Sequence, residues 1–77
     1  MSVKHSDKYK AIGLTIKRYR KMKNMTQEEL ADKLSISLSY LTKIEAQNCD
    51  KPFSLEIVFD IAEALDIPVI TLFEDIT

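Results

Sequence analysis

A polar surface is predicted along one side of residues 37–47, if this segment is helical. On a helical wheel, at about 100° per residue, Leu41, Ile44 and Glu45 share one side. The opposite side is small and polar, and carries Ser39, Thr42, Lys43, Ala46 and Gln47. Hydroxyls, one lysine and a small alanine allow a helix to lie close to the major groove of DNA and to bond base edges. Taken alone, such a face is more typical of a solvated helix. The flanking sequence must decide between a solvated face and a DNA-binding face.

The flanking residues predict two short helices at a tight corner. Thr26–Glu29 is a capping-box sequence, in which the Thr26 hydroxyl accepts from the backbone of Glu29, whose carboxylate accepts from the backbone of Thr26. A three-residue break follows, and Ser37 is a natural cap for a further helix running to about Ala46. This is the helix-turn-helix arrangement, in which the second helix enters the major groove.

The N-terminal part of the chain is predicted to be helical as well. One Gly and two Pro in 77 residues leave little room for hairpins, and alternation with a period of two is absent. Ser6 or Asp7 can cap a first helix through about Lys23. Asn24 then stands where a residue in the left-handed conformation would end this helix.

Two C-terminal helices complete the predicted fold. Ser54 can cap a fourth helix, and Pro68 suits the first turn of a short fifth helix. We therefore expect one all-α domain over residues 1–77, a compact five-helix bundle with a helix-turn-helix at about 26–46. The C-terminal helices, at about 54–73, would supply core and dimer contacts. The inward side of the fourth helix is predicted to hold Leu55, Val58, Ile61, Ala62 and Leu65.

Length and composition place further limits on function. A chain of this size buries only roughly 60–65% of its unfolded surface, so self-association would add stability. No apolar run approaches a membrane span and no signal-peptide pattern opens the chain, so we expect a cytoplasmic protein. Cys49 and His5 are single residues without metal-type neighbours, so we expect no metal or cofactor. The absence of a Gly-rich phosphate loop argues against an enzyme.

Charge is divided between two parts of the chain, although the net charge is only −1. All 11 Lys and Arg residues lie within residues 1–51, where six acids leave a charge of +5. Residues 52–77 hold six acids and no Lys or Arg, which gives −6. Such asymmetry is typical of a protein with one side facing a polyanion such as nucleic acid, although solvated charge runs are also common.

Together these motifs resemble the helix-turn-helix regulators typified by the phage Cro protein and repressor, called the XRE family. The resemblance covers about residues 12–74. It rests on Thr26-Gln27, Leu30-Ala31, Ser37, Tyr40-Leu41, Ile44-Glu45, Ser54-Leu55-Glu56 and Ile61-Ala62. Free-standing members include controller proteins of restriction–modification systems and small repressors. The resemblance implies a homodimeric transcription regulator on double-stranded DNA, with recognition helices about 34 Å apart on a near-palindromic operator.

The resemblance assigns base-reading roles to the second helix of the motif and its cap. Lys43 could donate to guanine O6 or N7, and Ser39 or Thr42 could serve several bases. Leu38 stands where the family commonly has a polar residue or Arg, and it either contacts a thymine methyl group or only packs at the helix start. The full set of matching positions is Ser37, Leu38, Ser39, Thr42 and Lys43.

Phosphate contacts are also implied by the resemblance, at Gln27, Tyr40, Asn48 and Lys51. Gln27 lies at the start of a helix, where N–H groups and the positive end of the helix dipole favour phosphate. The alternative for Gln27 is an ordinary helix-start residue. Tyr40 either bonds a phosphate through its hydroxyl or only packs, and Asn48 and Lys51 are otherwise ordinary polar loop residues.

Structural roles are expected for two further groups. By resemblance, Arg20 and Glu45 form an ion pair between the first and third helices, and Glu45 falls on the inward side of the wheel, where an unpaired carboxylate would be costly. The C-terminal apolar residues exceed what one face of each helix can bury, which favours a dimer interface over a monomer with an apolar tail. The predicted interface residues are Ile70, Phe73 and Ile76.

A protein-interaction module, such as an antitoxin, is the alternative to a DNA-binding regulator. Two or more acids on the outward side of the helix at residues 37–46 would favour this alternative, and the sequence has none there. An antitoxin that also represses its own promoter is compatible with every feature above.

Overall fold

The computed structural model describes residues 4–46 and 52–76. These residues contain four α-helices and one 3-10 helix, joined by turns and loops. The elements are α1 (Ser6–Met22), α2 (Gln27–Leu34), α3 (Leu38–Glu45), α4 (Leu55–Leu65) and the 3-10 helix η1 (Val69–Phe73). No strand occurs in this part of the chain. The all-α prediction is therefore confirmed, with the fifth helix in the 3-10 form. None of these helices is long and apolar enough to cross a membrane.

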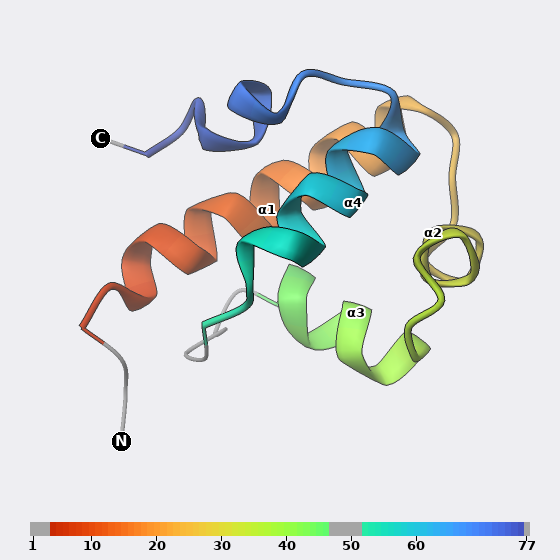
Figure 1. Ribbon diagram of the computed structural model, residues 1–77, viewed down its shortest axis with the longest axis horizontal. Coiled ribbons are helices and arrows are strands. Elements are labelled where there is room, and N and C mark those ends of the chain that lie inside the picture. The colour runs from red at the N-terminus through yellow and green to blue at the C-terminus, as the bar shows by residue number, and fades with distance from the viewer. Residues whose placement is uncertain (1–3, 47–51, 77) are drawn as a thin grey trace.

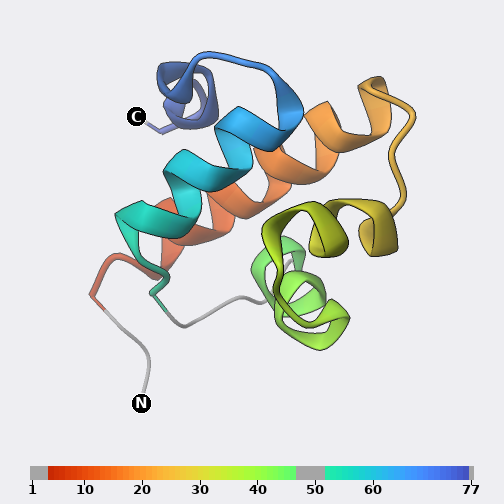
Figure 2. The same cartoon turned by 45° about the vertical axis from the view of Figure 1, so that its right-hand side comes forward.

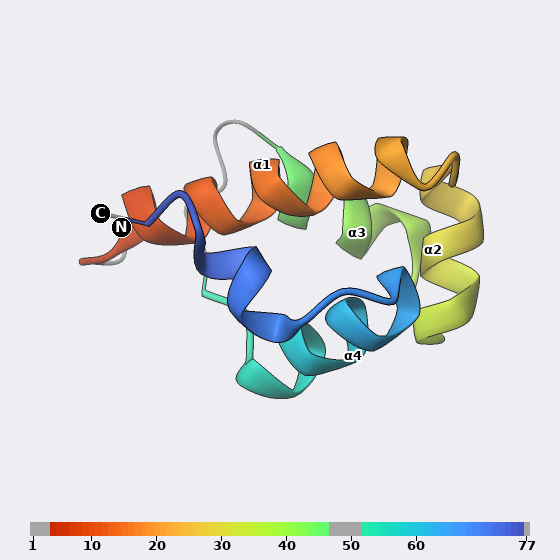
Figure 3. The same ribbon diagram turned by 90° about the horizontal axis from the view of Figure 1, so that it is seen from above.

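The longest helix, α1, spans the molecule, and α3, α4 and η1 pack around it (Figure 1). It contacts α3 on one side and η1 on another, and it also touches α4. Figure 2 shows α2 and α3 meeting at a tight corner on the side of the molecule away from η1. α2 closes one end of the domain, running from the end of α1 toward α4 (Figure 3). The helix-turn-helix is thus supported from behind by both long helices.

Local hydrogen bonds begin three of the helices where the sequence predicts, and Asn24 marks the end of the first. The Thr26 hydroxyl accepts from the backbone N–H of Glu29 at 3.0 Å, and the Glu29 carboxylate accepts from the N–H of Thr26 at 2.9 Å. This capping box lowers the pKa of Glu29, chiefly through the bond from the Thr26 backbone. Ser37 and Ser54 each accept the N–H of the third residue of the following helix, at 3.0 and 3.2 Å. Asn24 adopts the left-handed conformation with φ 56°.

Two predicted details at the ends of the chain are wrong. Neither Ser6 nor Asp7 caps α1, because the carbonyl of His5 already accepts from the next helical turn and His5 occupies the cap position without a side-chain bond. The fifth helix is of the 3-10 type because its bonds link residues three apart, as from Thr71 N–H to Pro68 O at 3.0 Å. Pro68 precedes this helix instead of lying in its first turn.

The inward side of α4 also differs from the prediction at one position. Leu55 is 61% exposed, because it is the first residue of α4 and lies at one edge of the buried stripe. The buried stripe of α4 consists of Ile57, Val58, Ile61, Ala62 and Leu65. These side chains join one core with others from every helix, among them Ile16, Leu30, Leu41 and Leu72.

Gly13 lets α1 and α3 approach each other closely. It is buried within α1, and a methyl group added to its Cα would overlap the carbonyl oxygen of Ile44 in α3. A backbone oxygen cannot rotate away as a side chain can, so only glycine fits at this crossing. The position of α3 against the domain therefore depends on one residue that has no side chain.

Candidate nucleic-acid interface

The turn between α2 and α3 is fixed by backbone hydrogen bonds. Ser35 adopts the left-handed conformation with φ 56° and ends α2. The N–H of Ser35 donates to Asp32 O at 3.2 Å, and the N–H of Ile36 donates to Ala31 O at 3.1 Å. These bonds satisfy the last carbonyls of α2, and Ser37 then caps α3 directly. The corner is therefore a tight helix-turn-helix connection, as predicted.

α3 divides into a buried side and an exposed side, as the wheel predicts. Leu41 and Ile44 are almost fully buried, and Glu45 is only 3% exposed. The five predicted base-reading residues all lie on the exposed side, and Tyr40, at 39% exposed, borders it. The exposed residues are Ser37, Leu38, Ser39, Tyr40, Thr42 and Lys43. The structure thus brings the predicted base-reading set together on one surface.

A buried ion pair holds α3 against α1. Arg20 Nε donates to Glu45 Oε2 at 2.8 Å, and Arg20 Nη2 donates to Glu45 Oε1 at 3.0 Å. The two residues are 6% and 3% exposed. Such a two-point bond fixes orientation as well as distance. The structure therefore contains the ion pair that the family resemblance implies.

Two further hydrogen bonds extend this pair into a network that the sequence analysis missed. Arg20 Nη1 donates to the carbonyl oxygen of Met25 at 2.7 Å, which ties down the segment between α1 and α2. Gln27, the first residue of α2, donates from Nε2 to Glu45 Oε1 at 3.0 Å. Glu45 is thus bonded to both α1 and α2, and the orientation of α3 is set from two directions.

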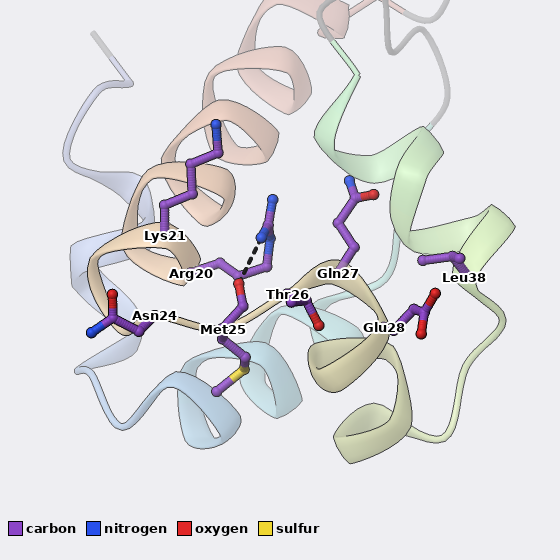
Figure 4. A pocket seen from close by; sticks show the side chains of 8 residues that line it. All are labelled: Arg20, Lys21, Asn24, Met25, Thr26, Gln27, Glu28 and Leu38. Atoms are coloured by element: carbon purple, nitrogen blue, oxygen red, sulfur yellow. Dashed lines mark hydrogen bonds between the residues drawn. The ribbon is translucent and has the colours of Figure 1, made fainter.

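An open cleft of about 640 Å³ lies beside this network, between the end of α1 and the starts of α2 and α3. Figure 4 shows Lys21 and Asn24 on the α1 side of the cleft, and Glu28 and Leu38 on the opposite side. Gln27 lines the cleft between them. A cationic side chain and the start of a helix suit a phosphate group. The carboxylate of Glu28 would repel a phosphate on its side of the cleft.

The internal bonds of Ser37 and Thr42 restrict what these residues can offer a base. The Ser37 oxygen accepts from the N–H of Tyr40, so its hydroxyl hydrogen and one lone pair are left for a partner. The Thr42 hydroxyl does the reverse, because it donates to Leu38 O at 2.8 Å. Neither restriction can be deduced from residue type alone.

The remaining predicted residues lie outside the exposed side of α3 or outside the part of the chain that the structure describes. Asn48 and Lys51 lie outside the described residues. Among the predicted interface residues, Ile70 is 74% exposed, whereas Phe73 and Ile76 are partly buried and pack against the core. Within residues 4–46 and 52–76, no three His, Cys, Asp or Glu side chains gather in a group that could hold a metal ion.

The acidic pair Glu74 and Asp75, near the C-terminus, bonds to α1. Asp75 accepts from the Thr15 hydroxyl at 2.9 Å and from Arg18 Nη1 at 3.0 Å. Glu74 accepts from the Tyr19 hydroxyl at 2.8 Å and forms an ion pair with Arg18. These contacts join residues more than 50 positions apart, so sequence spacing could not predict them. They hold the end of the chain over α1.

Asp75 should make stability depend on acid pH. Its bonds from Thr15 and Arg18 lower its pKa. The stabilisation is therefore fully present above the ordinary Asp value of about 3.9 and is lost as the pH falls through the lowered value. We expect Asp75→Asn to have a lower melting temperature than the wild type at pH 7, and the two to converge near pH 2. A difference that stays constant with pH would contradict this. Asp60→Asn controls for loss of a negative charge, since Asp60 is an exposed residue of α4.

The fold and this surface define a helix-turn-helix domain of the DNA-binding type, with an exposed polar face on its second helix. The chain belongs to the helix-turn-helix family HTH_3, whose model matches residues 16–72. This confirms the resemblance to the XRE type of regulator. The family and the relatives below are regulators and not enzymes.

Known relatives are transcription regulators by name. SinR of Bacillus subtilis strain 168, an HTH-type transcriptional regulator, is 38% identical over 64 residues, which are 83% of this chain and 57% of SinR. This chain thus spans little more than half the length of that relative.

Solved structures of two regulators have the same fold. The restriction–modification controller protein C.AhdI from Aeromonas hydrophila matches with a TM-score of 0.76 at 29% identity, over 84% of this chain and 96% of C.AhdI. SinR in complex with DNA, described as the master regulator for biofilm formation, matches with a TM-score of 0.73 at 38% identity. That match covers 82% of this chain and 98% of the SinR chain in the structure.

Proposed function

We propose that this protein is a sequence-specific, double-stranded DNA-binding transcription regulator that places α3 in the major groove. The observation that carries the proposal is the exposed polar side of α3 on a helix whose opposite side is fixed by buried bonds. A mobile helix could not select a base sequence, and a helix with acids on its outer side would repel phosphate. The relationship to SinR, which has been solved with DNA, supports the same function.

Roles for the exposed side chains follow from their hydrogen-bonding groups. Lys43 donates to guanine O6 or N7, and Ser39 bonds a neighbouring base edge. Ser37 has a hydroxyl hydrogen to donate. Gln27 contacts a phosphate with the amide hydrogen that does not go to Glu45, and with its main-chain N–H at the start of α2. Further phosphate contacts are proposed for Tyr40, Asn48 and Lys51.

The regulator is proposed to act as a homodimer on a near-palindromic operator. Ile70 supports this proposal, because it is 74% exposed and its burial against a second copy of the chain would stabilise the dimer. Phe73 and Ile76 would contribute their outer parts to the same interface. A two-fold axis there would place two copies of α3 about one DNA turn, or 34 Å, apart.

Replacing Lys43 with alanine should weaken operator binding about 10-fold to 100-fold, because one guanine contact accounts for roughly 1–3 kcal/mol. The variant should also lose its preference at one base pair of each half-site. Sequencing of bound fragments selected from random DNA, for the wild type and Lys43→Ala in parallel, measures both effects. Lys33→Ala is the matched control, since Lys33 is an exposed lysine of α2 outside the predicted contact set. Unchanged base preference in Lys43→Ala would exclude Lys43 as a base-reading residue.

A protein-binding module is the second candidate, and the exposed side of α4 favours it. Leu55 and Phe59, one turn apart, are 61% and 49% exposed. Apolar side chains at this spacing on a helix are suited to contact another protein. An antitoxin-type protein that binds both a partner and DNA would use this face in addition to α3.

A further inference from the structure

By residue type, Thr42 could donate a hydrogen bond to a base, but its hydroxyl hydrogen already bonds within α3. Thr42 Oγ1 donates to the carbonyl oxygen of Leu38 at 2.8 Å, one turn earlier in α3. A threonine hydroxyl has one hydrogen only. While this bond lasts, Thr42 can offer an approaching base its methyl group and the lone pairs of its oxygen, but no proton.

Leu38 is a second aliphatic side chain on the exposed side of α3, one turn before Thr42. Residues four apart on a helix are neighbours on its surface, so the two side chains can meet the same region of the groove. Leu38 is 41% exposed, whereas Leu41 and Ile44 of the same helix are almost fully buried. The core therefore does not account for the leucine side chain. Figure 4 shows Leu38 on the side of the cleft opposite α1, near Glu28.

The two side chains together favour one kind of base edge. In the major groove, thymine differs from cytosine by its C5-methyl group and its acceptor O4, and apolar side chains contact this methyl group. We propose that Leu38 and the Thr42 methyl group form a patch that selects a pyrimidine with a C5-methyl group, at one position of each half-site. This inference rests on the proposed function of α3 as the recognition helix. Lys43 and Ser39 would read their bases by hydrogen bonds instead.

Two substitutions at Thr42 separate the methyl group from the hydroxyl. Thr42→Ser keeps the hydroxyl and removes the methyl group, while Thr42→Val keeps a methyl group at that position and removes the hydroxyl. If the methyl group selects thymine, Thr42→Val retains the selection and Thr42→Ser loses most of it. If the hydroxyl bonds the base, the two variants behave in the opposite way.

The probe is a duplex recovered by selection from random DNA, in which each thymine is replaced in turn by deoxyuridine. This change removes the C5-methyl group and leaves every hydrogen-bonding group in place. Fluorescence anisotropy should show one position per half-site where wild-type binding weakens roughly threefold to fivefold, the effect expected for one buried methyl group. Cytosine at that position should bind more weakly than 5-methylcytosine. Leu38→Ala and Thr42→Ser should show much smaller effects of deoxyuridine, and Thr42→Val should not.

The outcomes distinguish this inference from the function on which it rests. Sequence-specific binding that is insensitive to deoxyuridine at every position would overturn the methyl-reading patch and leave the DNA-binding function intact. The same holds if Thr42→Ser keeps the full discrimination. Failure to recover any preferred sequence, from protein with the wild-type helical circular dichroism spectrum, would overturn both.

Discussion

Replacing Glu45 with alanine is expected to lower the free energy of unfolding by about 3–5 kcal/mol, because the charge of Arg20 would remain buried without its partner. Three donors, from Arg20 Nε, Arg20 Nη2 and Gln27 Nε2, would lose their acceptor at once. The free energy of unfolding of a domain of this size is only roughly 4–12 kcal/mol in total. The variant should therefore be close to unfolding at 25 °C, which urea denaturation followed by circular dichroism would measure.

A double-mutant cycle tests whether the ion pair itself causes this loss. The cycle compares Arg20→Met, Glu45→Leu and the double variant with the wild type. The double variant removes both charges and fills similar volumes, so it should cost less than the sum of the two single changes and less than Glu45→Ala alone. Glu56→Ala is the control for removing a carboxylate, since Glu56 is exposed on α4. Costs of the two single changes that simply add would contradict a buried, coupled pair.

Replacing Gly13 with alanine is expected to destabilise the domain by about 1–3 kcal/mol, the usual cost of forcing an extra methyl group into a packed contact. Alanine is the better helix former by about 1 kcal/mol, so the contact with Ile44 must outweigh that gain. The overlap is with the backbone carbonyl of α3, so α1 and α3 must move apart. DNA binding should therefore weaken as well, because the exposed side of α3 moves relative to α2.

Leu14 provides the matched comparison for Gly13. It is the next residue of α1 and is 39% exposed, so the difference between its Gly and Ala variants measures helix propensity with little packing. At Leu14 the alanine variant should be the more stable of the two, and at position 13 the glycine protein should be. Urea denaturation of all four proteins gives both differences. If alanine is more stable than glycine at both positions, the close approach of α1 and α3 does not require glycine at position 13.

Local features of the fold could be predicted because their causes lie within a few residues. Thr26, Ser37 and Ser54 each bond the N–H of a residue three positions later, so sequence spacing alone is sufficient. Asn24 ends α1 by its own backbone preference. The exposed side of α3 also follows from helical periodicity, and the family resemblance implied the pair of Arg20 with Glu45.

Contacts between distant residues could not be predicted in the same way. The bond from Gln27 to Glu45 and the crossing of Gly13 with Ile44 depend on how the helices are set against one another. A single glycine in the middle of a predicted helix is a signal of close backbone approach, but it does not name the partner. The internal bond of Thr42 depends on a side-chain rotamer that residue type leaves open. Leu55 was predicted to face inward, but it is the first residue of α4, at the edge of the buried stripe, and is largely exposed.

Selection of bound fragments from random DNA and from genomic DNA, at moderate salt, tests the central claim most directly. A dimer that inserts two copies of α3 into successive major grooves should enrich an inverted repeat whose half-site centres are about 10 base pairs apart. Binding to the enriched sequence should weaken steeply as salt is raised, because phosphate contacts release counterions. No enriched sequence, from protein shown to be folded, would contradict the account and direct attention to a protein partner.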